Sequence, residues 1–169
     1  MRQRKMACLG VHFVLNDIDV ATIRDLEDDA ARLTYVQEVI ELRELSGPGA
    51  AENDKAWDAM HRALSDGQLT LEGGEYPLNH VVLGGELIYE GEDYLMSLKT
   101  PPEVKDIASA LRELSEPAFR ERYLRIGEDY DGALGEEDLA YTWHWFQGVR
   151  ELYFRAAEQG SHVLFAADQ

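Results

Sequence analysis

The sequence is poor in cysteine, because Cys8 is the only one among its 169 residues. A lone cysteine forms no disulfide within the chain, so the sequence fits a reducing compartment such as the cytoplasm. The same scarcity excludes zinc deaminase chemistry, which needs cysteine ligands in a PCxxC turn. Since Cys8 lies beside an apolar run, we expect an inert core thiol rather than a nucleophile.

Long apolar runs are also missing, and none reaches the roughly 18 residues that a membrane-spanning helix requires. The run over residues 6–15 follows Arg2, Arg4 and Lys5 and so imitates a short signal peptide, but no small-x-small cleavage site follows it. We therefore interpret it as a buried strand. Residues 1–5 are predicted to be a disordered extension, and residues 6–169 a single domain.

Positive charge is scarce, because 16 Lys and Arg face 33 Asp and Glu, which gives a net charge of -17. Such a chain repels the phosphates of nucleic acids and anionic membrane surfaces, so neither is an expected partner. Two interpretations of the acidic balance stay open. It is either a coat that favours solubility or, where the charges cluster, an attraction for a basic protein partner.

Complete catalytic and cofactor signatures are absent as well. The sequence contains no HExxH zinc motif, no GxxxxGK[ST] phosphate loop, no GxGxxG fingerprint and no GxSxG elbow. The acidic segment from Gly127 to Asp138 resembles a calcium loop, but its first position is a glycine, which offers no side-chain ligand. The sequence therefore predicts no metal and no cofactor.

Short apolar segments predict strands at Leu9 to Leu15, Leu87 to Tyr89, Tyr94 to Leu98 and Val163 to Ala166. Several helices of unequal length separate them, and the longest ends at Gly160. This pattern predicts an α+β protein, in which a small, mostly antiparallel or mixed sheet is packed by several helices with a long C-terminal one.

Helix boundaries are marked by side chains that bind free backbone amides. Thr100 and Glu103 form a capping box, and Pro101 occupies the first helical position. Asn53 or Asp54 is expected to cap the helix that begins near Trp57.

The stretch from Trp57 to Glu86 carries the candidate site residues. Asp58 and His61 lie three apart, so a helix presents them on one face, as a proton-transfer pair or half a metal site requires. His80 and Glu86 join them if the following loop folds back. The competing interpretation is structural, with Asp58 as a first-turn acid and the histidines bound to backbone.

Tryptophans offer a second kind of candidate, since Trp57, Trp143 and Trp145 could line a pocket, although packing is the default role of aromatic side chains. On a helix Trp143 and Trp145 cannot face the same way, so at least one must pack in the core or an interface.

The order of these motifs resembles the YfbM-like family of uncharacterised bacterial proteins. The resemblance depends mainly on Trp57-Asp58-x-x-His61 and on the segment Pro77-Leu78-x-x-x-Val82-Leu83-Gly84. It implies a compact α+β domain of the bacterial cytoplasm and carries over no activity and no catalytic residue. Independently of the resemblance, we expect the Trp57 helix and the Gly84-Gly85 loop to pack as one buried unit.

Three functional hypotheses follow. The first is a non-catalytic, soluble binding domain for a protein or small molecule, in one version an immunity-type protein that recognises a basic partner. The second is an enzyme with Asp58, His61, His80 and Glu86 around a pocket, which requires both histidines in an open cleft. The third is a structural subunit of a homo-oligomer, which requires a large exposed apolar face.

Overall fold

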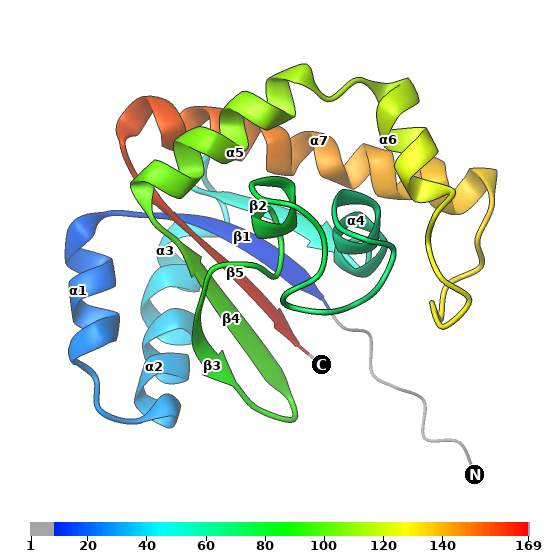
Figure 1. Ribbon diagram of the computed structural model, residues 1–169. Coiled ribbons are helices and arrows are strands. Elements are labelled where there is room, and N and C mark those ends of the chain that lie inside the picture. Colours follow the sequence, from blue (N-terminus) through cyan, green and yellow to red (C-terminus); the bar gives the residue numbers. More distant parts are fainter. Residues whose placement is uncertain (1–8, 169) are drawn as a thin grey trace, which may run out of the picture.

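The computed structural model describes residues 9–168, so the predictions for residues 1–5 and for Cys8 lie outside it. One antiparallel sheet runs in the order β2-β1-β5-β4-β3 (Figure 1). Its strands are β1 (Gly10–Leu15), β2 (Ala50–Asp54), β3 (Glu86–Glu90), β4 (Tyr94–Lys99) and β5 (His162–Asp168). The single α+β domain with an antiparallel sheet is confirmed, as are the four predicted strands.

Helices cover both faces of the sheet, which gives three layers (Figure 1). One face carries α1 (Asp17–Asp25), α2 (Asp29–Tyr35), the π-helical turn η1 (Val36–Ile40) and α3 (Glu41–Glu44). The other carries α4 (Trp57–Leu64), the 3-10 turn η2 (Leu78–His80), α5 (Pro101–Glu113), α6 (Glu116–Tyr123) and α7 (Glu136–Gln159).

Each face of the sheet has its own hydrophobic core, because successive side chains along a strand point to opposite faces. In β1, Phe13 and Leu15 are buried in the core beneath α1 and η1. His12 is fully buried on the opposite side, where Val14 packs against the core beneath α4 to α7.

The predicted helix boundaries hold where side-chain caps mark them. Thr100 and Glu103 form the capping box of α5, with Pro101 in its first turn. Helix α7, the longest with 24 residues, ends at Gly160, whose φ of 65° suits a residue without a side chain. Within residues 9–168, no helix combines the length and apolar character that a bilayer crossing needs.

The predicted cap of α4 is wrong. Asn53 and Asp54 belong to strand β2, and α4 begins after Ala56, which has no side-chain cap. The segment pairs with β1 as an edge strand, which its composition did not indicate because it contains no β-branched or aromatic residue.

The predicted unit around the tryptophan helix is confirmed. Trp57 is 6% exposed, and Met60 of α4 shares one core with Val81 and Val82 of the loop. The Trp57 ring also lies 5.7 Å from the ring of Phe165 in β5, so the unit is anchored on the sheet.

Candidate functional site

Asp58 and His61 both serve the packing of α4. The Asp58 carboxylate accepts a 2.6 Å hydrogen bond from Nε of Arg62. The Arg62 side chain is nearly buried, and its Nη1 donates a second hydrogen bond to Asp129 at 3.0 Å. His61 is buried and its Nε2 donates to the Thr70 carbonyl at 2.7 Å. Burial lowers the pKa of His61 to about 4, so the ring is neutral at physiological pH.

His80 and Glu86 have interaction partners other than Asp58 and His61. His80 Nδ1 bonds the Asn79 side chain at 2.8 Å, and its Nε2 lies 3.2 Å from the Glu103 carboxylate. Burial lowers the pKa of His80, while Glu103 opposes the shift. Glu86 pairs with Arg24 at 2.8 Å on the surface.

The structure therefore gives each of the four candidates its own partners and does not gather them around a common pocket. None of them lines a described hollow. Across residues 9–168, no three His, Cys, Asp or Glu side chains converge as a metal site requires.

Sequence reasoning missed a buried polar network beneath the loop of residues 81–82. The carbonyl of Val82 accepts bonds from Lys99 Nζ at 2.5 Å and Ser97 Oγ at 3.0 Å, and both side chains are fully buried. Burial holds the pKa of Lys99 well below its usual value. The network therefore fixes the loop through buried hydrogen bonds to the Val82 carbonyl.

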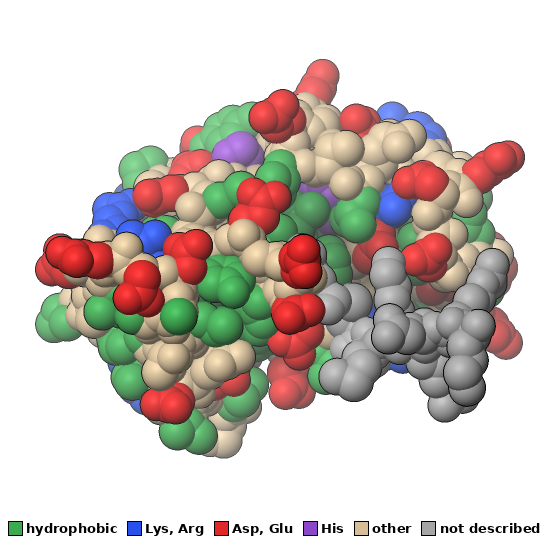
Figure 2. Space-filling view, turned by 90° about the horizontal axis from the view of Figure 1, so that it is seen from below, with side chains coloured by type: hydrophobic (Ala, Val, Ile, Leu, Met, Phe, Trp, Pro, Cys, Tyr) green, Lys and Arg blue, Asp and Glu red, His purple; other side chains and the backbone are tan. Residues whose placement is uncertain are grey.

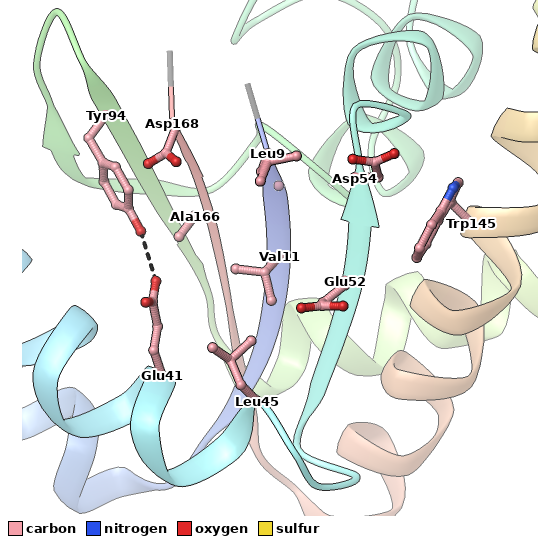
Figure 3. Close-up of a pocket in the computed structure, with 11 residues that line it drawn as sticks. Leu9, Val11, Glu41, Leu45, Glu52, Asp54, Tyr94, Trp145, Ala166 and Asp168 are labelled. Carbon is pink, nitrogen blue, oxygen red and sulfur yellow. Dashed lines mark hydrogen bonds between the residues drawn. The ribbon is translucent and has the colours of Figure 1, made fainter. Parts of the chain in front are cut away.

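A hollow of about 300 Å³ opens at the end of the sheet on the α3 side, and we call it the sheet-end hollow (Figure 3). Its lining combines four carboxylates, two aromatic rings and an apolar floor. The carboxylates belong to Glu41, Glu52, Asp54 and Asp168. Seen from below, acidic side chains are spread over the molecule and border apolar surface (Figure 2).

Strand register explains why the acids gather there. Val11 of β1 lies opposite Glu52 on one side and Ala166 on the other, so all three face the hollow in one row. Asp168 lies opposite Tyr94 in the adjacent pair β5 and β4. The sheet thus places one acidic side chain on each flank of an apolar stripe.

On the side toward α3, Glu41 and Tyr94 have raised pKa values. Burial raises the pKa of Glu41, the nearby Asp168 carboxylate adds to the shift, and the hydrogen bond from Tyr94 at 3.3 Å opposes it. Burial, Glu41 and Asp168 together raise the pKa of the Tyr94 phenol. Among the described residues that line the hollow there is no Lys or Arg, so its field is negative.

The opposite side is built by β2 and α7. Tyr141 of α7 donates a hydrogen bond to Asp54 and packs edge-on against Trp145, at 6.4 Å between ring centroids. Trp145 is half-buried at the rim of the hollow, beyond β2 (Figure 3). Trp143 instead packs on Phe119, at 5.3 Å between centroids, as expected for two tryptophans on different helix faces.

Comparison with known proteins supports the fold. Residues 6–166 match a family described as a domain of unknown function, DUF1877. The crystal structure of a protein of unknown function, YfbM from Escherichia coli, is similar with a TM-score of 0.65 and 21% identity, over 94% of this chain and 99% of that one. No curated protein matches the chain. The predicted resemblance to the YfbM-like family is confirmed.

Proposed function

Since the chain belongs to the DUF1877 family, whose description names no activity, we propose from its own geometry that it is a non-catalytic domain that binds a basic protein partner. One version of this role is immunity-type, in which the domain neutralises a basic toxin in the bacterial cytoplasm. The observation that carries the proposal is the sheet-end hollow, where four carboxylates surround apolar and aromatic surface.

Charge and shape together support a protein partner. A net charge of -17 steers basic proteins toward the chain, and a hollow lined by one sign of charge focuses the field. Aromatic side chains such as Trp145 are typical of protein interfaces, where they add large contact areas. The exposed fractions of Leu9 (49%) and Leu45 (44%) leave apolar area for a partner to cover.

The enzyme hypothesis receives no comparable support. It required both histidines in an open cleft, whereas His61 is buried and bonded to a backbone carbonyl. Asp58 is engaged by Arg62, so it is not available as a base.

Affinity purification from the native host tests the proposal. The wild-type chain is compared with a variant that carries Glu41→Gln, Glu52→Gln, Asp54→Asn and Asp168→Asn. Asparagine is chosen at position 54 because the native φ of 48° is tolerated by asparagine. We expect a captured protein of basic pI, and at least about a tenfold weaker Kd for the variant in calorimetry with the purified partner.

A matched control separates the hollow from overall charge. The substitutions Asp25→Asn, Glu121→Gln, Glu128→Gln and Glu158→Gln remove the same number of charges from exposed positions. We expect this control to keep its Kd within about twofold. An equal loss of affinity in both variants, or a partner without basic character, would contradict the proposal.

A further inference from the structure

We propose that the sheet-end hollow binds two cationic side chains of one partner segment, Lys or Arg, separated by an apolar side chain. This inference rests on the proposed function and names the chemistry of its contact. It follows from the arrangement of the four carboxylates, which form two pairs on opposite sides of the hollow (Figure 3). Glu41 and Asp168 form one pair, and Glu52 and Asp54 form the other.

The width of the hollow exceeds the reach of one ammonium group. The pairs belong to β2 on one side and to β5 with α3 on the other, and β1 lies between β2 and β5. Two strand spacings amount to about 10 Å, so a cation at one pair lies beyond hydrogen-bond distance of the other. Two positive groups are therefore needed to neutralise both sides.

The floor between the pairs is apolar. Leu9, Val11 and Ala166 line it, and Leu45 closes it toward α3. Leu9 and Leu45 are about half exposed, so an apolar side chain placed over them removes hydrophobic area from water. The hollow thus presents one pair of carboxylates, an apolar floor and a second pair of carboxylates, in that order. A complementary segment carries two basic side chains with an apolar side chain between them.

Each pair has a feature that favours an organic cation. The Glu41 and Asp168 carboxylates repel each other beside the Tyr94 hydroxyl, and a cation between them relieves that repulsion. Next to the second pair, Trp145 offers a ring face that attracts ammonium and guanidinium groups. A metal ion fits less well, because within residues 9–168 no three acidic or histidine ligands converge.

Diaminoalkanes reproduce this chemistry in small probes, since each has two ammonium groups on an apolar spacer. The full-length chain, labelled with ¹⁵N, is titrated with 1,4-diaminobutane, 1,8-diaminooctane and octylamine. The indole N–H signal of Trp145 reports on the hollow, while those of Trp57 and Trp143 are internal references. A Trp145→Phe variant assigns the signal.

We expect 1,8-diaminooctane, whose extended length matches the separation of the pairs, to bind about fivefold more tightly than the other two probes. Glu41→Gln with Asp168→Asn, or Glu52→Gln with Asp54→Asn, should reduce its affinity to that of octylamine. The control Asp25→Asn with Glu158→Gln should leave it unchanged. No shift of the Trp145 signal, or equal affinity for all three probes, overturns the inference.

Two further outcomes are decisive. If the probes show no preference while a basic host protein is still captured through the hollow, the two-cation inference fails and the proposed function stands. The chain's own Arg2, Arg4 and Lys5 are competing cations. If 1,8-diaminooctane binds only after these three are replaced by serine, the occupant is the chain itself, and the inference of a partner segment is overturned.

Discussion

The His12 imidazole and the Tyr153 phenol meet at one acceptor, since both donate to the carbonyl oxygen of Val81 at 2.7 Å. The amide of Asn53 donates to the other ring nitrogen of His12 at 2.8 Å, which fixes the proton on Nε2. These bonds join β1, β2 and α7 to the loop after η2. The loop is therefore bound directly by side chains of β1 and α7, and Asn53 of β2 orients the histidine.

Removal of one donor tests this junction. Tyr153→Phe deletes a buried hydroxyl but leaves His12 on the same carbonyl, so we expect a loss of about 1 kcal/mol in the free energy of unfolding. Urea denaturation measures it. Tyr76→Phe removes an exposed hydroxyl bonded to Asp106 and should cost less. If both variants lose equally little, the Tyr153 bond contributes nothing to stability.

The buried histidines should make the protein sensitive to acid. Burial lowers the pKa of His12 to about 3 and that of His61 to about 4, whereas an unfolded histidine has a pKa near 6.5. Between these values the unfolded chain binds protons that the native state does not, so the free energy of unfolding falls as pH falls below 6.5. Each histidine contributes a loss of about 2 kcal/mol between pH 7 and pH 5.

Glutamine substitutions isolate these contributions. His12→Gln and His61→Gln should each flatten the pH dependence of unfolding by that amount, whatever their effect at pH 7. His144→Gln, at an exposed position, serves as control and should leave the slope unchanged. Wild-type slopes in both buried variants would contradict the assignment.

Two glycines should respond oppositely to alanine. A Cβ at Gly10 would lie 2.3 Å from Oδ1 of the buried Asn53 and 2.7 Å from the Trp57 ring, so we expect Gly10→Ala to cost about 2 kcal/mol through overpacking. At Gly148 inside α7, the nearest atom is 4.0 Å away in Ala51. Gly148→Ala should stabilise by about 0.5–1 kcal/mol through helix propensity. Thermal unfolding of both variants gives the comparison, and equal signs would contradict it.

We expect Arg62 to contribute to the free energy of unfolding, although it lies beside Asp58, a candidate catalytic acid. The Arg62 side chain is 4% exposed, so Arg62→Met leaves the partly buried Asp58 without its cation and should cost about 3 kcal/mol. The exposed pair of Arg24 and Glu86 provides the control, and Arg24→Met should cost under about 1 kcal/mol. Chemical denaturation at low and high salt measures both. Similar losses in the two variants would contradict this role.

The sequence predicted the elements whose signals are local. The capping box at Thr100, the glycine after α7 and the short apolar segments of β4 and β5 are each signals within a few residues. Strand β2 was missed because its pairing with β1 is set by a distant partner rather than by its own residues. The direction of Trp143 away from Trp145 was predictable, because helix geometry alone separates them.

The sites were less predictable than the fold. His61 and His80 looked catalytic because histidine titrates near neutral pH, but burial and backbone partners are invisible in a sequence. The sheet-end hollow was missed because its acids come from α3, β2 and β5, which only the folded sheet and the helix packed on it bring together. An excess of 33 acidic over 16 basic residues looks the same in a sequence whether the charges are scattered or clustered in the fold.

The place of β5 in the sheet has a consequence for biosynthesis. β5 follows every other strand in the chain, yet it lies between β1 and β4 and separates the early half of the sheet from the late half. Until residues 162–168 are synthesised, the edges of β1 and β4 that pair with β5 have no partner strand. The nascent chain therefore exposes two unpaired strand edges until β5 inserts between them, and such edges favour aggregation during synthesis.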